Sequence, residues 1–477
     1  METPAKAASE IAISALREKV PAALELANEF SKAGFKLALV GGSVRDILLN
    51  RLGNDLDLTT DARPDDIKKI LKKWADDIWE VGIRFGTIGA KSDNLIFEIT
   101  TYRSEVYLED SRKPSVEFGN SIEVDLSRRD FTVNAMAIEL TGEIHFIDPY
   151  DGVRDLLLKV LKTPGTPELS FGDDPLRMLR AARFAAQLGF SIDSDLLVAM
   201  RKMADRLSII SAERIRDELI KLIMSKDPRV GLTTLVETGL CEKFLPEIPL
   251  LRLEIDEHHH HKDVYEHTLT VVEQSIALEE RLGGPNLVAR LAALLHDIGK
   301  PKTRALIPGG GVSFHHHEVV GSRMAKERLK KLRFDHQIVD DVSKLVFLHL
   351  RFHGYGGGEW TDSAVRRYVR DSGDLLIHLH VLTRADCTTR NQRKAETLAK
   401  NYDHLESRIE ALMAEEELLK LRPDLDGHQI MEILGVKAGP MVGKAYDFLM
   451  ELRLEHGPLG EIKAREELLS WWAKNQS

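Results

Sequence analysis

The chain has 477 residues, of which 43% are hydrophobic and 30% are charged, and its formal net charge at pH 7 is −10. This length exceeds what one hydrophobic core usually organises, so we expect two to four domains. The acidic balance argues against a protein that coats nucleic acid indiscriminately, although it is compatible with a local basic groove. With two cysteines, no apolar run of membrane-spanning length and no signal-peptide pattern, the expected compartment is the cytoplasm and no membrane partner is expected.

The first part of the chain combines helical and strand patterns. Residues up to about Ala33 are predicted to form one leading amphipathic helix, and from Phe35 onward short apolar stretches alternate with helical ones. The polar stretch from Ser104 to Phe118, interrupted by Pro114, predicts a mobile loop. The predicted strands cover residues 37–40, 55–59, 87–90, 95–101 and 144–147.

After Asp155 helical periodicity dominates, and histidines become frequent after Pro246. The predicted helices of the middle part cover residues 175–188, 195–207, 211–224 and 230–238. We therefore predict an α+β protein in four parts. They are a head with a small mixed sheet at 1–155, a helical neck at 156–245, a second all-helical domain at 246–400 and a helical C-terminal region at 401–477.

Two short patterns near the start of the chain point to phosphate chemistry. An apolar strand ends in the double glycine Gly41-Gly42, and a helical pattern opens at Ser43, so bare backbone N–H groups would face an anion there. Asp55 and Asp57 lie at i and i+2 of a predicted strand, which projects both carboxylates from one face. Two carboxylates beside a triphosphate are what a pair of Mg²⁺ ions needs for nucleotidyl transfer.

A third pattern is the run Arg128-Arg129-Asp130, followed by Asn134. A guanidinium group can bind a phosphate through two parallel hydrogen bonds. A carboxylate can accept hydrogen bonds from ribose hydroxyls. Taken alone, the same run is equally compatible with a surface cluster of salt bridges.

A fourth pattern begins at Asp174, which is predicted to cap a helix that has Pro175 at its first position. Arg177, Arg180 and Arg183 then recur along one stripe of that helix, with no acidic partner at i+4. Such a stripe needs an anionic or planar group against it. An aspartate and an arginine one turn apart can also offer donors and acceptors to the edge of a base.

These patterns, from about Leu37 to Met224 and in this order, resemble the class II nucleotidyltransferase family, which contains tRNA CCA-adding enzymes and bacterial poly(A) polymerases. The resemblance implies a polymerase-β-like head, an all-helical neck, Mg²⁺ as cofactor, and tRNA, CTP and ATP as partners. It assigns metal binding and catalysis to Asp55 and Asp57, while Glu98 is either a third carboxylate or a structural ion-pair partner. The predicted nucleotide-binding residues are Gly41, Gly42, Ser43, Arg45, Arg128, Arg129, Asp130, Asn134, Asp174, Arg177, Arg180 and Arg183.

Gly42 and Arg45 resemble the residues that contact the triphosphate in this family. Asp174 and Arg177 resemble the two residues that pair with the incoming base and so replace a nucleic-acid template. The segment from Ile83 to Gly89 is closer to the CCA-adding form than to the poly(A) polymerase form. An A-adding enzyme or a poly(A) polymerase on the same scaffold stays the alternative. A rival of a different class is a metal-dependent phosphohydrolase whose head only recruits RNA.

The histidine-rich part contains the doublet His296-Asp297 after an apolar helix, with His267 upstream and Asp386 downstream. Histidines and aspartates spaced over several helices are typical of metal sites. The pattern resembles the HD phosphohydrolase superfamily, with these four residues in the ligand positions. The resemblance implies a divalent transition metal (Mn, Ni, Co or Fe) or Mg at this site, and it leaves catalysis there open.

Three further residues of this part resemble functional positions in some members of that superfamily. His317 and His349 resemble residues that bind substrate or a second metal, and Lys300 is a candidate phosphate contact. The run from His258 to His261 is expected to begin the helix that leads to the first histidine ligand.

Overall fold

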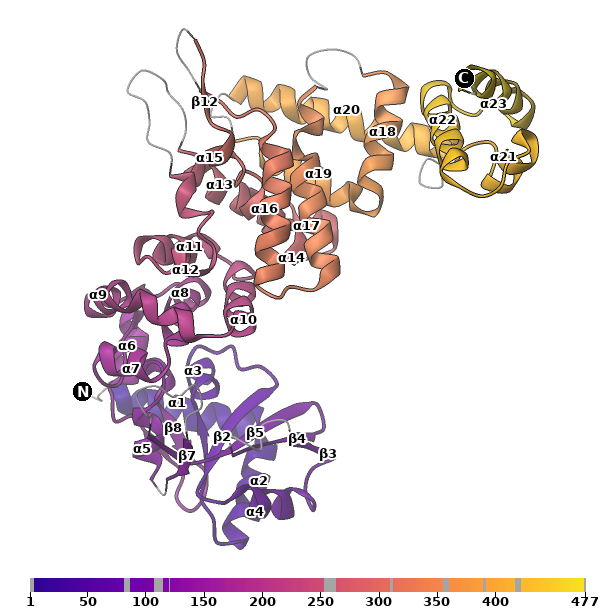
Figure 1. Ribbon diagram of the computed structural model, residues 1–477. Helices are drawn as coiled ribbons and strands as arrows, with labels where there is room; N and C mark the ends of the chain where they lie inside the picture. The colour runs from indigo at the N-terminus through magenta and orange to yellow at the C-terminus, as the bar shows by residue number, and fades with distance from the viewer. Residues whose placement is uncertain are drawn as a thin grey trace. The chain divides into compact units, whose positions relative to one another are not determined.

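The computed structural model describes residues 4–80, 86–106, 115–119, 121–252, 263–308, 312–354, 360–388, 392–416 and 422–475. The chain divides into two compact units, Met1–Phe244 and Leu245–Ser477, whose elements are labelled in Figure 1. The finer division into four parts stays a prediction. Among the described helices, none combines the length and the apolar character that crossing a membrane requires.

The first unit begins with two helices, α1 (Pro4–Lys19) and α2 (Pro21–Lys32), so the prediction of a single leading helix is wrong. The break falls at Val20, whose φ of −138° and ψ of 57° lie outside the helical region. Pro21 lacks the N–H that a continuous helix would need, but it suits the first position of a new one.

A seven-stranded sheet forms the centre of the head, in the order β3-β4-β5-β2-β1-β8-β9. β2 and β5 run parallel, and the other neighbouring strands are antiparallel, which confirms the predicted mixed sheet. The strands are β1 (Leu37–Val40), β2 (Asp55–Thr60), β3 (Asp77–Trp79), β4 (Thr87–Ser92), β5 (Leu95–Thr101), β8 (Ala137–Glu139) and β9 (His145–Ile147).

The two faces of this sheet are covered unequally. Leu56 and Leu58 of β2 belong to the large core, which also contains buried side chains of α1, α2, α3 and α4. Side chains alternate along a strand, so Asp55 and Asp57 project from the opposite face, where a smaller cluster forms around Val40 and α5. The head helices are α3 (Gly42–Leu48), α4 (Pro64–Leu71), α5 (Ile122–Ser127) and α6 (Gly152–Leu158).

The stretch predicted as a mobile loop contains a strand at each end. β6 (Arg103–Val106) and β7 (Ser115–Phe118) pair antiparallel, from Arg103 opposite Phe118 to Val106 opposite Ser115. The loop prediction is therefore wrong for these ends, because backbone hydrogen bonds pair the two segments. Residues 107–114 lie outside the described residues, as do Ile83 to Phe85 of the segment used to distinguish family members.

Helices make up most of the rest of the first unit, as predicted. α8 begins at Leu176, one residue later than expected, and Oδ1 of Asp174 accepts the N–H of Leu176 at 3.0 Å. The predicted helix 195–207 ends earlier, at Met203, and a 3₁₀ segment follows it. These elements are α7 (Pro167–Asp173), α8 (Leu176–Leu188), α9 (Ser194–Met203), η3 (Ala204–Ile209), α10 (Ala212–Ile223), α11 (Pro228–Glu237) and α12 (Cys241–Phe244).

The second unit is built mainly from helices. Its first part contains the histidine-rich region, and α21, α22 and α23 close a small core of their own around Leu449 and Leu468. The α+β fold class with a helical second part is thus confirmed. The helices are α13 (Val264–Ala277), α14 (Leu287–Leu295), α15 (Lys300–Thr303), α16 (His317–Lys331), α17 (His336–Leu348), α18 (Asp362–Ser372), α19 (Leu376–Ala385), α20 (Gln392–Glu416), α21 (Gly427–Leu434), α22 (Pro440–His456) and α23 (Glu461–Asn475).

Candidate nucleotide site and metal centre

The turn between β1 and α3 depends on its first glycine. Gly41 has a φ of 68°, in the region that favours glycine, and a Cβ there would lie 2.5 Å from Nη1 of Arg129. At Gly42 a Cβ would make only ordinary contacts, 3.5 Å from Nη2 of Arg45 and 3.9 Å from Oδ2 of Asp57. The turn therefore places the Gly42 backbone beside one arginine and one carboxylate of the predicted site.

Three carboxylates of the predicted site share one face of the sheet. Asp57 lies opposite Glu98 in the parallel pair, and both side chains, like that of Asp55, are exposed. Oγ of Ser43 accepts the backbone N–H of Asp57 at 2.9 Å and so ties α3 to β2.

The electrostatics of this group favour a cation. Desolvation by the surrounding protein raises the pKa of Asp57 above its usual value, although the guanidinium groups of Arg129 and Arg45 oppose the shift. Desolvation also raises the pKa of Glu98, and the nearby Asp57 and Asp55 raise it further. The charged neighbours that shift the pKa of Glu98 are thus both carboxylates.

A chain of hydrogen bonds joins α3 to α8. Nη1 of Arg45 donates to Oδ1 of Asn134 at 2.5 Å, and Nδ2 of Asn134 donates to Oδ1 of Asp130 at 2.9 Å. Oδ2 of Asp130 accepts from Nε and Nη2 of Arg180 at 2.8 and 2.6 Å. Burial would raise the pKa of Asp130, but Arg180 and Asn134 outweigh it and lower this pKa to about 2.

The arginine stripe of α8 has acidic partners that lie far away in the sequence. Nε of the buried Arg183 donates to Oε2 of Glu218 at 2.6 Å, and Nη1 of Arg180 lies 3.6 Å from Oε1 of the same residue. The ring of Phe184 supplies a planar neighbour, since its centroid is 4.1 Å from Cζ of Arg183 and 5.2 Å from Cζ of Arg45. The requirement for an anionic or planar partner is therefore met inside the fold.

The predicted base-selecting pair lies at the start of α8, and both side chains are held in place. Nη2 of Arg214 donates to Oδ2 of Asp174 at 2.7 Å. Arg177 donates to Oγ of Ser170 at 2.9 Å and to the backbone oxygen of Arg128.

The remaining two arginines of the predicted set share one buried acid. Nε of Arg128 and Nη2 of Arg129 lie 3.4 and 3.2 Å from the carboxylate oxygens of Asp125. Sequence reasoning missed Asp125, Arg214 and Glu218. A signal existed for the first, because Asp125 precedes the two arginines by three and four residues at the end of a helix.

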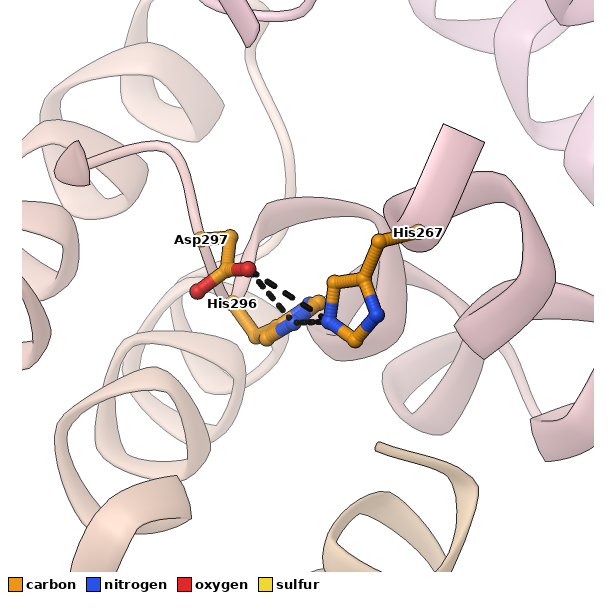
Figure 2. A group of neighbouring side chains, drawn as sticks. All are labelled: His267, His296 and Asp297. Atoms are coloured by element: carbon orange, nitrogen blue, oxygen red, sulfur yellow. Dashed lines mark hydrogen bonds and ion pairs between the residues drawn. The ribbon is translucent and has the colours of Figure 1, made fainter. Parts of the chain in front are cut away.

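The second site lies in the other unit, where α13, α14 and α19 bring the four predicted HD ligands together. Figure 2 shows His267, His296 and Asp297 facing one another, with Nε2 of His296 3.3 Å from Nε2 of His267 and 3.2 Å from Oδ2 of Asp297. Oδ1 of Asp386 lies 2.9 Å from Nε2 of His267 and 3.6 Å from Nε2 of His296.

The donor set fits a divalent cation. Ligand atoms of His267, His296 and Asp297 all lie within 4.8 Å of one another. Nδ1 of His296 lies 2.8 Å from the carbonyl oxygen of Ala293, which can only accept, so the proton of the neutral ring is on Nδ1 and the lone pair of Nε2 faces the cluster.

Opposite charges within this cluster shift the pKa values of their neighbours. Burial lowers the pKa of His296, but Asp297 and Asp386 outweigh it and raise the value above normal. Burial would raise the pKa of Asp297, yet His296 and Lys300 hold it well below its usual range. Lys300, the candidate phosphate contact, places Nζ 2.6 Å from Oδ2 of Asp297. The run from His258 to His261 lies outside the described residues.

Three family models match the chain in consecutive segments. They are the poly A polymerase head domain over residues 37–162, the probable RNA and SrmB-binding site of polymerase A over residues 189–251, and the HD domain over residues 264–391. The first covers the glycine turn and the three carboxylates, and the third covers the His/Asp cluster.

Among curated proteins, the chain is similar to CCA-adding enzymes. It is 41% identical to that of Enterococcus faecalis over 221 residues, which cover 46% of this chain and 53% of the relative. It is 40% identical to that of Lactobacillus johnsonii over 232 residues, which cover 48% of this chain and 57% of the relative. The chain thus spans about half the length of the curated relatives it matches.

Solved structures extend the likeness in fold to almost the whole chain. The Bacillus stearothermophilus CCA-adding enzyme in complex with CTP has a TM-score of 0.66 at 23% identity, covering 99% of both chains. The Thermotoga maritima CCA-adding enzyme complexed with tRNA has a TM-score of 0.57 at 19% identity, covering 94% of both. The chain thus combines a segment that matches the poly A polymerase head, a segment that matches an RNA-binding domain and a segment that matches the HD domain, in a fold shared with solved CCA-adding enzymes.

Proposed function

We propose that this protein adds CCA to the 3′ end of tRNA from CTP and ATP without a nucleic-acid template. The observation that carries the proposal is the exposed pair Asp55 and Asp57, which shares a sheet face with Glu98 beside the turn at Gly41 and Gly42. The 40–41% identity to CCA-adding enzymes supports this activity over the poly(A) polymerase and A-adding alternatives.

In this proposal the chain's own groups position the reactants. Asp55 and Asp57 would hold Mg²⁺, which when bound neutralises charge on the triphosphate and favours ionisation of the attacking hydroxyl. Arg45, fixed by Asn134 and Asp46, would contact the triphosphate. The tRNA 3′ oxygen forms a bond to the α-phosphorus of CTP or ATP, and pyrophosphate leaves with the electrons of the broken bond.

Nucleotide choice would depend on Asp174 and Arg177 at the start of α8. A carboxylate and a guanidinium together offer acceptors and donors to the edge of a base. Arg214 and Ser170, which bond to them, would fix the directions in which they present these groups.

The first experiment uses three tRNA transcripts that end before CCA, after C and after CC, each incubated with CTP, ATP or both. Addition of all three nucleotides in order is the expected result. ATP addition to the CC-ended transcript alone would identify an A-adding enzyme, and long A-tails on any RNA would identify a poly(A) polymerase.

A site test separates catalysis from RNA recruitment. The double variant Asp55→Ala/Asp57→Ala should lose nucleotide incorporation, whereas Asp65→Ala, which removes an exposed carboxylate of the same domain, should keep it. Incorporation by the double variant at the parental rate would contradict the proposed site.

The His/Asp cluster favours a second activity, metal-dependent hydrolysis of phosphate esters. His267, His296, Asp297 and Asp386 would hold Mn, Ni, Co, Fe or Mg, which when bound makes a water molecule a better nucleophile at neutral pH. Assays with a 2′,3′-cyclic nucleotide and p-nitrophenyl phosphate under each metal test this. Asp297→Ala should abolish hydrolysis and leave CCA addition intact, and loss of both activities would contradict two separate sites.

A further inference from the structure

Three guanidinium groups from two helices converge on the ring of Phe184. Cζ of Arg183 lies 4.1 Å from the ring centroid, that of Arg45 lies 5.2 Å from it and that of Arg180 lies 5.3 Å from it. Arg45 belongs to α3, whereas Phe184 and the other two arginines belong to α8. All three distances lie within the range of about 6 Å over which the face of an aromatic ring attracts a cation.

The contacts of Arg45 come from different parts of the fold. Its Nε and Nη2 donate to the carboxylate of Asp46 at 3.0 and 2.9 Å, but Asp46 is the next residue of the same helix and moves with it. Nη1 donates to Oδ1 of Asn134 at 2.5 Å, within the head. The ring of Phe184 is the contact that ties this guanidinium directly to α8.

The ring and the guanidinium are both removed from solvent. Arg45 and Phe184 are each 6% exposed. The ring is itself fixed by the buried Phe131, which it meets edge to face with centroids 5.7 Å apart and planes at 87°. A cation over an aromatic face is held most strongly where water is excluded, so this ring can restrain Arg45 effectively.

The restrained group lies beside the turn that is proposed to bind phosphate. A Cβ at Gly42 would lie 3.5 Å from Nη2 of Arg45, and the charge of this guanidinium also acts on Asp57, whose pKa it lowers. A shift of Arg45 would therefore change the positive charge that an incoming triphosphate meets.

We infer that Phe184 is a positioning residue for nucleotide binding, whose ring holds the Arg45 guanidinium in place to contact the triphosphate. This deepens the proposed function, because it rests on the triphosphate contact that the proposal gives to Arg45. It also connects the two ends of the nucleotide, since α8 carries the proposed base-selecting residues at its start and this ring eight residues further on from Leu176.

The test changes the charge distribution of the ring while nearly preserving its shape. Mono-, di- and trifluorinated phenylalanine are placed at position 184 of the full chain by nonsense suppression, because each added fluorine weakens the attraction of the ring for a cation. Calorimetry then measures the Kd for CTP and for inorganic tripolyphosphate with Mg²⁺ and without RNA. We expect stepwise weakening of both, to about tenfold for the trifluorinated ring. A Kd that is independent of fluorination would overturn the inference, because packing alone does not respond to ring electronics.

A double-mutant cycle shows whether the ring acts through Arg45. Phe184→Leu should weaken CTP binding about tenfold in the parent but less than about twofold in an Arg45→Ala background. Equal effects in both backgrounds would overturn the inference. Phe190→Leu removes a similarly buried ring just beyond the end of α8 and should keep the parental affinity. Circular dichroism selects the folded variants, and the fluorinated series stands without them.

Incorporation is measured in parallel on the transcript that ends before CCA, so that the two proposals fail separately. The fluorinated series should raise the KM for CTP and leave kcat near the parental value, whereas a lower kcat at unchanged KM would overturn the inference. Graded CTP affinity without any incorporation would uphold the role of Phe184 and contradict CCA addition. CCA addition with a CTP affinity that ignores fluorination would uphold the proposed function and contradict the inference.

Discussion

Arg183 of α8 and Glu218 of α10 form a buried ion pair, with Nε of the arginine 2.6 Å from Oε2 of the glutamate. Arg180 reaches the same carboxylate at 3.6 Å. One acid on α10 therefore holds two of the three arginines of α8, and through Arg180 it is connected to Asp130. The orientation of α8, which carries the proposed base-selecting residues at its start, depends on a residue 35 positions away from Arg183.

Glu218→Ala should destabilise the first unit by about 3 kcal/mol, because removing one partner leaves a buried charge uncompensated. Urea unfolding followed by circular dichroism measures this. Asp217→Ala, which removes an exposed partner of Arg216 on the same helix, should change stability by no more than about 1 kcal/mol. Equal effects of the two substitutions would show that burial of the pair is energetically unimportant.

Gly41→Ala should reduce nucleotide incorporation about tenfold or more, because alanine strains the turn at a φ of 68° and a displaced turn that loses ~1.4 kcal/mol of transition-state binding slows the reaction by that factor. The new methyl group would also displace Arg129. Gly53→Ala is the matched control, because its Cβ would meet no atom within 4 Å. Single-turnover incorporation on a tRNA transcript measures the effect, and an unchanged rate for Gly41→Ala would show that this turn tolerates a side chain.

Asp174→Ala should reduce the selectivity between CTP and ATP, because one of the two groups proposed to contact the base is lost. Arg214→Ala should have a smaller effect of the same kind, since it releases the Asp174 carboxylate from a 2.7 Å hydrogen bond. The measurement is the ratio of incorporation rates for CTP and ATP on the transcript that ends before CCA. Unchanged selectivity in Asp174→Ala would rule out the proposed role.

The stability of the second unit should depend on pH through His380. Burial lowers the pKa of this imidazole to about 4, despite Glu406 at 3.4 Å, whereas in the unfolded chain it is about 6.5. The unfolded state therefore binds the extra proton first, and stability falls by about 1.4 kcal/mol per pH unit as pH drops from about 6.5 toward 4.

His380→Phe removes this titration and retains a ring to stack on Tyr368. Urea unfolding at pH 6.5 and 5.5 should show a fall in stability that is smaller by about 1 kcal/mol in the variant than in the parent. His428→Phe, at an exposed position, should keep the parental pH dependence. Identical pH dependence in the parent and His380→Phe would contradict the low pKa.

Local patterns predicted the parts of the fold that bury alternating side chains. The strands over residues 37–40 and 95–101 agree with β1 and β5 at both ends, because β1 is a short apolar run that is wholly buried and β5 buries side chains in partial alternation. The pairing of β6 with β7 left no such signal, since polar segments pair there through backbone hydrogen bonds. The division of the first helix at Pro21 was present in the sequence and was overlooked.

For both sites, the sequence predicted which residues take part but not which contacts these residues make. The sequence suggested the arginine stripe of α8, but its acidic partner Glu218 comes from another helix, and such a contact depends on tertiary structure. The four HD ligands followed from a family resemblance. The carbonyl oxygen of Ala293, which fixes the imidazole of His296, is placed by backbone geometry that no spacing along the chain encodes.

Because side chains alternate along β2, the residues of this strand that stabilise the head differ from the residues proposed to carry its chemistry. Leu56 and Leu58 supply the strand's share of the large core, whereas Asp57 lies where desolvation and the neighbouring Asp55 disfavour its charge. Selection for folding alone would therefore favour loss of Asp57. Keeping this carboxylate charged costs the head stability, so β2 both stabilises the domain and holds a group whose proposed activity opposes stability.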